Sequence, residues 1–142
     1  MQRKTFIRTL ATMAAAAALP LAAQAQTVKL TLGHGAAPGN PRHEASVKFA
    51  EVLKAKTNGR IEVQVAPSAQ LGDDAAMVTA LRTGALDMSA NSQGAVANAV
   101  PEYAAFGMPF LFSNAAAAFK LLDGPLGKEL ADKSAEKGLI AL

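Results

Sequence analysis

Few side chains in this sequence are suited to catalysis. It has no cysteine and only two histidines, so thiol nucleophiles and thiolate metal ligands are excluded. His34 stands in a glycine-rich loop, where it either contacts a ligand or is a polar loop residue satisfied by the backbone. His43 falls in a predicted first helical turn, where a neutral imidazole can act as a cap. Two prolines lie between them, and their spacing suits no helical metal site.

The hydroxyl and carboxylate groups give no stronger sign of catalysis. A serine hydrolase needs a nucleophile, a base and an orienting residue, and no serine here stands in a Gly-x-Ser-x-Gly turn. Asp73 and Asp74 could pair for acid–base chemistry, but adjacent carboxylates at a helix start are typical of capping residues. The glycine-rich loop around Gly35 lacks the Gly-x-Gly-x-x-Gly dinucleotide pattern. We therefore expect no enzyme activity, no cofactor and no bound metal.

Alternating strands and helices must position these residues. Apolar and polar residues alternate in three segments that we predict to be strands, over residues 28–32, 61–65 and 86–90. The helices between them begin after the N-cap Asn40 and at Asp73, and they end at Asn58-Gly59 and at Gly84. This order predicts an α/β domain with a mostly parallel sheet and helices on both faces.

The last third of the chain follows a looser pattern. Residues 103–112 are rich in aromatic side chains. Ser113 or Asn114 is predicted to cap an alanine-rich helix, and a further helix runs from the Gly124-Pro125 turn to about Lys137. Residues 139–142 resemble the start of a strand, which we expect to be an unprotected sheet edge or a frayed end.

The charge is concentrated at the N-terminus. The chain has 14 Lys and Arg against 11 Asp and Glu, and Arg3, Lys4 and Arg8 account for the whole excess. The rest of the chain is formally neutral, so no basic face for nucleic acid is expected. Those three cations, the apolar residues 10–23 and the sequence Ala-Gln-Ala at 23–25 predict a signal peptide cleaved after Ala25, and hence a periplasmic protein. Lys4 stands where twin-arginine signals have a second arginine, so both that route and the general one remain open.

Polar loops follow each of the three predicted strands. Because ligands bind outside the carboxyl ends of parallel strands, we expect the loops at 33–35, 67–74 and 91–94 to converge on one site. Arg42 falls near this edge but on a helical turn, and we do not assign it as a group that clamps a substrate. The sequence thus locates a candidate site without giving its chemistry.

Seven segments in order resemble the solute-binding proteins of TRAP (tripartite ATP-independent periplasmic) transporters, the DctP-type family. They lie at residues 32–43, 49–51, 57–61, 67–74, 84–88, 109–112 and 124–130. The resemblance implies a hinged protein of two α/β lobes that closes around a small organic anion and delivers it to membrane permease subunits. It also implies a longer chain, so we expect residues 26–142 to be a truncated first lobe. The arginine that holds the ligand carboxylate in the family has no counterpart here.

The resemblance also implies a set of residues that line the cleft, without a specific role for each. These candidates are Gly33, His34, Gly35, Gln70, Asp74, Asn91, Ser92 and Gln93. The identity of the acid stays open among dicarboxylates, 2-oxo acids, sugar acids and sialic acid. Since half a cleft leaves a ligand largely solvated, we expect weak or no binding by this chain alone.

Two other classes of function remain as alternatives. One is a small periplasmic α/β enzyme, such as a hydrolase or isomerase, which the scarcity of histidine and absence of cysteine disfavour. The other is a stand-alone interaction domain, for which the apolar segment 103–112 would supply an exposed docking surface.

Overall fold

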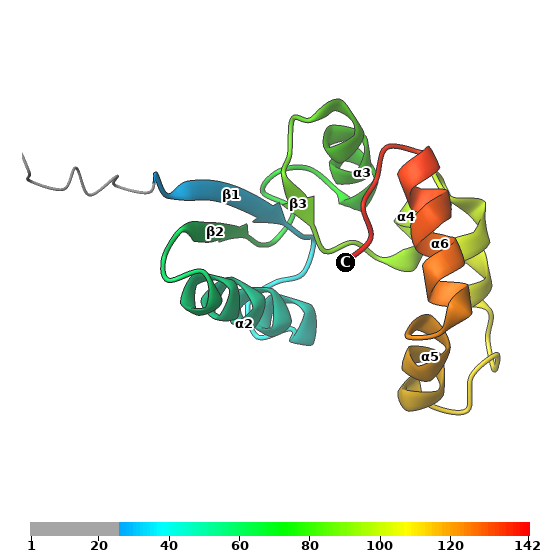
Figure 1. The fold of residues 1–142 in the computed structure, drawn as a ribbon. Coiled ribbons are helices and arrows are strands. Elements are labelled where there is room, and N and C mark those ends of the chain that lie inside the picture. The colour runs from blue at the N-terminus through cyan, green and yellow to red at the C-terminus, as the bar shows by residue number, and fades with distance from the viewer. Residues whose placement is uncertain (1–25) are drawn as a thin grey trace, which may run out of the picture.

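The computed structural model describes residues 26–142 and contains a small parallel sheet (Figure 1). The strands are β1 (Val28–Gly33), β2 (Ile61–Ala66) and β3 (Met88–Ser89), in the order β2-β1-β3. β1 pairs in parallel with both neighbours, and its last residue, Gly33, lies opposite Ala66 and Ser89. The carboxyl ends of all three strands therefore meet at one edge. The signal peptide predicted for residues 1–25 lies outside the described residues.

Two helices flank the sheet and confirm the α/β organisation (Figure 1). α2 (Pro41–Lys56) packs along β2 on one face, and α3 (Asp74–Thr83) lies on the opposite face. The N-cap of α2 is Asn40, whose side chain accepts the Arg42 N–H, and Pro41 occupies the first turn as predicted. α3 ends at Gly84, whose φ of 74° is the left-handed conformation that favours glycine.

Close packing of α3 on β1 depends on a residue without a side chain. Gly33 is buried, and a Cβ built on it would lie 2.7 Å from the Met77 sulfur and 3.3 Å from Leu71. Met77 is fully buried beneath α3, so its thioether has little room to move. Leu86 lies 3.6 Å from the same position and completes this contact, and Leu32 and Val78 are also buried in β1 and α3.

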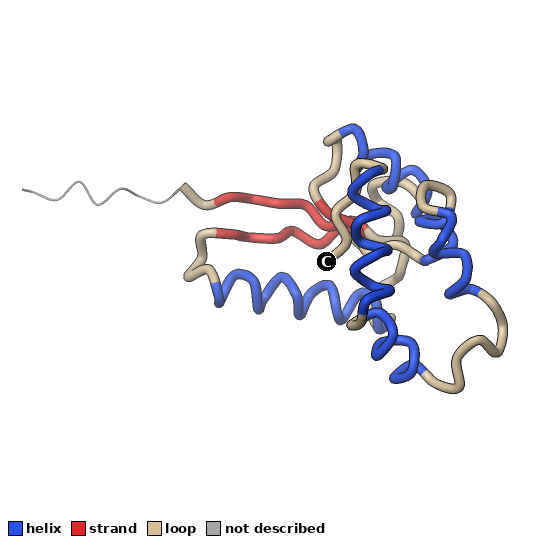
Figure 2. The backbone as a smooth tube through the Cα atoms, turned by 45° about the vertical axis from the view of Figure 1, so that its right-hand side comes forward, coloured by secondary structure: helices blue, strands red, loops and turns tan. Residues whose placement is uncertain are grey.

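The rest of the described chain forms a helical layer beside the sheet (Figure 2). Its elements are α4 (Gln93–Ala97), the 3-10 helix η1 (Pro101–Gly107), α5 (Ala115–Leu122) and α6 (Pro125–Glu136). Val100 and Leu130 are buried there, and the Tyr103 hydroxyl lies 3.3 Å from the Ser134 hydroxyl. Arg82 of α3 donates to the Lys137 carbonyl at 3.1 Å, which connects the layer to the sheet. No helix among residues 26–142 is long and apolar enough to cross a membrane.

Two predicted elements differ in the structure. The third strand is shorter than 86–90 because the Asp87 carboxylate accepts the Thr31 N–H at 2.8 Å, taking the place of a strand carbonyl beside β1. Residues 139–142 form no strand. The Leu139 N–H is bonded to the Ser134 carbonyl at the end of α6, and the exposed Ile140 and Leu142 side chains that follow have no strand partner.

Replacing Gly33 tests the packing of α3 on the sheet. We expect Gly33→Ala to lower the free energy of unfolding by about 1–3 kcal/mol, because the added methyl group overpacks a buried contact. Gly94→Ala is the matched control, since that position has open space and lies in α4, where alanine is the better helix former. Urea denaturation followed by circular dichroism measures both. Equal stability of the two variants would contradict the packing described.

Candidate functional site

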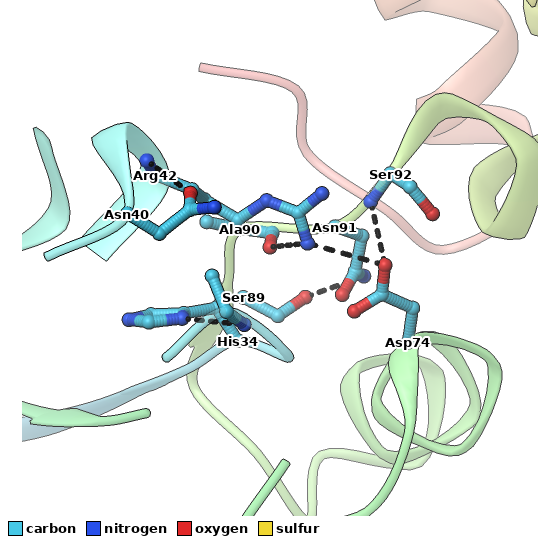
Figure 3. Close-up of polar contacts among 9 residues, drawn as sticks. His34, Asn40, Arg42, Asp74, Ser89, Ala90, Asn91 and Ser92 are labelled. Atoms are coloured by element: carbon cyan, nitrogen blue, oxygen red, sulfur yellow. Dashed lines mark hydrogen bonds and ion pairs between the residues drawn. The ribbon is translucent and has the colours of Figure 1, made fainter. Parts of the chain in front are cut away.

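The three loops converge as predicted, and Asp74 connects them (Figure 3). Asp74 is the first residue of α3, and its Oδ2 accepts the Ser92 N–H at 2.8 Å, beyond β3. The same oxygen lies 3.3 Å from Nη1 of Arg42, in the first turn of α2. One carboxylate thus holds together the segments that follow β1, β2 and β3. Asp73 has a different task, because its Oδ1 accepts the Ala76 N–H and caps α3.

The Asp74 carboxyl is held in its ionised form. Partial burial raises its pKa, but hydrogen bonding from Ser92, together with the Arg42 guanidinium, outweighs that effect and lowers the pKa below its usual range. Asp74 therefore stays charged at neutral pH. About a third of the Arg42 side chain and a fifth of the Asp74 side chain are exposed, so solvent screens their pairing only in part.

Arg42 belongs to the site, which the sequence analysis did not assign. Its Nη1 also points at the Ala90 carbonyl, 3.5 Å away, and about a third of its side chain is exposed. In Figure 3 the side chain extends from α2 across the ends of the strands toward Asp74. The signal for this placement was present: a helix that follows a strand in a parallel sheet begins at the carboxyl edge, so its first turn faces the site.

His34 lies beneath this edge rather than on it. Its side chain is fully buried, its Nδ1 accepts the Ala36 N–H at 3.2 Å, and its Nε2 lies 3.3 Å from Nδ1 of His43. Since Nδ1 is an acceptor, the proton of the neutral ring belongs on Nε2, which donates to His43. Burial, and then the nearby His43 and Arg42, lower the pKa of His34, and the negative charge of Asp74 only partly offsets them. His34 thus fixes the conformation of the loop after β1.

The loop after β3 contributes a second polar cluster. The Asn91 amide donates to the Ser89 hydroxyl at 2.7 Å, which leaves Asn91 Oδ1 and Asp74 Oδ1 buried without a hydrogen-bond partner. In Figure 3 these two oxygens face each other. Rotating the Asn91 amide by 180° places its NH₂ toward the ionised Asp74 and lets its oxygen accept from Ser89, which satisfies both groups. We assign that orientation to Asn91.

An open hollow of about 500 Å³ lies beside Arg42 and Asp74. Its lining comes from the loop after β1, the first turn of α2 and the start of α3, and consists of Gly35, Ala36, Asn40, Arg42, Ala69, Asp73 and Asp74. A Cβ at Gly35 would lie 3.0 Å from Asp74 Oδ1, so the loop approaches the carboxylate closely only because residue 35 is glycine. The size of the hollow suits a small organic molecule.

The other candidate residues occupy different positions around the hollow. Gly33 is buried under α3, and Gln70 is exposed in the turn after β2, outside the lining. Gln93 begins α4, and its side-chain amide packs against Gly107 in the space that a Cβ there would occupy.

Of the eight candidates, Gly35 and Asp74 line the hollow directly, and His34, Asn91 and Ser92 support it from below or from the side.

The arrangement is that of a polar binding surface. Among residues 26–142, no group of three or more His, Asp or Glu side chains is placed to hold a metal ion. The buried serine hydroxyls, at Ser46 and Ser134, donate to backbone carbonyls of their own helices rather than to a histidine. The groups that remain are a guanidinium, a carboxylate and backbone amides, which bind polar ligands.

Comparison with known proteins identifies the family. Residues 32–142 match the model of the bacterial extracellular solute-binding proteins, family 7, and the chain belongs to this family. The protein y4mM of Sinorhizobium fredii is 58% identical over 113 residues, which are 80% of this chain and 21% of that protein. The C4-dicarboxylate-binding periplasmic protein DctP of Rhodobacter capsulatus is 33% identical, over 88% of this chain and 38% of its own length.

Solved structures of the same kind share the fold. The sugar acid binding protein DctPAm of Advenella mimigardefordensis, in complex with galactonate, superimposes with a TM-score of 0.76 at 36% identity, over 81% of this chain and 37% of that one. A TRAP periplasmic solute binding protein of Sulfurospirillum deleyianum with bound succinate gives 0.74 at 32%, over 82% and 38%. The chain thus spans between a fifth and two fifths of the length of these proteins.

The buried His34 predicts a pH-dependent stability. Because folding lowers its pKa, the unfolded chain takes up a proton below about pH 6.5 that the folded chain resists. The free energy of unfolding is therefore highest above that pH and falls on acidification, by at most about 1.4 kcal/mol per pH unit from this group. Denaturant titrations from pH 7 to pH 5 measure the slope, and that range lies above the titration of Asp74.

His34→Asn provides the comparison, since the asparagine oxygen can accept the Ala36 N–H in place of Nδ1. We expect a shallower slope in this variant, whatever its absolute stability. An equal slope in both proteins would show that His34 does not resist protonation.

Proposed function

We propose that this chain forms part of the ligand cleft of an extracytoplasmic solute-binding protein of a TRAP transporter. It would capture a small organic acid and present it to the membrane permease subunits. The observation that carries the proposal is the polar hollow at the carboxyl ends of β1 and β2, where Asp74 also holds the loop after β3. The family match and the organic acids bound by the related structures support it.

The proposal includes the compartment and the domain organisation. The predicted signal peptide and the periplasmic location of relatives such as DctP support export to the periplasm. Residues 26–142 would form the first part of one lobe, with the facing wall of the cleft supplied by further chain of the kind that the longer relatives contain. The hollow is open to solvent on one side, as one wall of such a cleft would be.

A docking role has one observation in its favour. Met108, Phe110 and Phe119 are more than half exposed, and Phe110 adopts a φ of 62°, which is unusual for a residue with a side chain. In the proposed function these apolar side chains pack against the rest of the longer protein. An enzyme role has no comparable support, because no serine hydroxyl among residues 26–142 is hydrogen-bonded to His34 or His43.

Titration with organic acids tests the proposal. We expect succinate, galactonate and glucuronate to shift the backbone amide resonances of residues around the hollow, such as Ala36, Asp74 and Ser92. Dissociation constants on the order of a millimolar or weaker are expected, since one wall leaves the ligand largely solvated. The uncharged polyol galactitol is the control and should leave the resonances unchanged.

Two results would contradict the proposal. If none of the acids shifts these amides, the chain does not contain the acid-binding wall. If the chain alone binds an acid at micromolar concentration, the hollow is a complete site and not one wall of a cleft.

A further inference from the structure

We propose that Arg42 binds a carboxylate group of the ligand and that Asp74 is the positioning residue that orients it. The inference rests on the proposed function, because it assigns a role within the same hollow. It adds a carboxylate-binding arginine in the first turn of α2, on the wall that this chain supplies.

The guanidinium is held by one of its nitrogens only. Nη1 lies 3.3 Å from Asp74 Oδ2 and 3.5 Å from the Ala90 carbonyl oxygen. Nη2 and Nε make no hydrogen bond with any of residues 26–142. Arginine presents five N–H donors in a rigid plane, so two partners at one nitrogen fix the plane while most of the donors stay available.

The available donors can reach a ligand. Arg42 lines the hollow, and about a third of its side chain is exposed there, which is enough for contact with a small molecule. A carboxylate accepts two parallel hydrogen bonds, so it matches a guanidinium edge with two free N–H groups better than a single hydroxyl does. The geometry therefore favours the acidic group of the ligand over its uncharged part.

The nearby carboxylates do not occupy the free donors. Asp73 Oδ1 accepts the Ala76 N–H, and Asp74 Oδ2 accepts the Ser92 N–H. Both are held at the positive end of α3, which offsets their negative charge. Glu44, the remaining acidic group of the first turn of α2, is exposed to solvent and is not part of the lining. An anion can therefore approach Arg42 without displacing a bound carboxylate.

Succinate titrations of matched variants test this role. We expect Arg42→Gln to weaken succinate binding by at least about tenfold, the effect of losing charge-assisted hydrogen bonds. Arg42→Lys keeps the charge but not the planar fork, so it should restore only part of the affinity. Arg60→Gln is the control, because Arg60 precedes β2, donates to the Thr57 carbonyl and lies outside the hollow. Amide resonance shifts give the dissociation constants.

A second readout needs no variant. In the wild-type chain, the Arg42 Nε–Hε resonance should shift on addition of succinate and stay in place on addition of the neutral analogue 1,4-butanediol. If succinate binds but neither this resonance nor the affinity of Arg42→Gln changes, the inference is wrong while the proposed function stands. If no acid binds to the wild-type chain, both are overturned.

Discussion

The geometry of the candidate site depends on one carboxylate, that of Asp74. The sheet alone brings the ends of β1, β2 and β3 to one edge, but it does not fix the loops that leave them. Asp74 does so by accepting the Ser92 N–H and pairing with Arg42. Since the hydrogen bonds to Ser92 and the charge of Arg42 also keep the carboxyl ionised, the groups that Asp74 positions are the same groups that maintain its charge.

The packing beneath the Asp74 carboxylate explains why it can contact the segments that follow all three strands. Gly33 lets α3 approach β1 closely, and this places the first residue of α3 above the strand ends. His34, buried next to Gly33, holds the loop after β1 through the Ala36 N–H, and Gly35 leaves room for the Asp74 carboxylate. A substitution that moves α3 on the sheet would therefore also displace the ion pair between Asp74 and Arg42.

Local signals in the sequence predicted most of the framework. The N-cap residues Asn40 and Asp73, and the alternation that defines β1 and β2, depend only on neighbouring residues and are confirmed. The length of β3 could not be predicted, because it is set by a side chain, that of Asp87, bonding to Thr31 on another strand. Of the two outcomes expected for residues 139–142, the structure has the frayed end and not the sheet edge, because a strand needs a partner, which local pattern does not reveal.

The location of the site was predicted from the sequence, but the pairing of its side chains was not. Convergence of the loops follows from parallel topology, which the order of elements predicts. Two adjacent aspartates at a helix start look alike in sequence, yet Asp73 caps α3 and Asp74 reaches other loops. Arg42 was not assigned because its partners, Asp74 and Ala90, lie 32 and 48 residues away along the chain. Such pairings depend on tertiary structure.

Hydrogen exchange at the Ser92 amide tests the role of Asp74 most directly. In Asp74→Ala the Ser92 N–H loses its acceptor, while the Ala90 N–H keeps its bond to the Gly33 carbonyl at 3.0 Å. The account predicts that the substitution removes the protection of Ser92 and leaves that of Ala90 largely intact. Unchanged protection of Ser92 in a folded Asp74→Ala chain would contradict the claim that this carboxylate holds the three loops together.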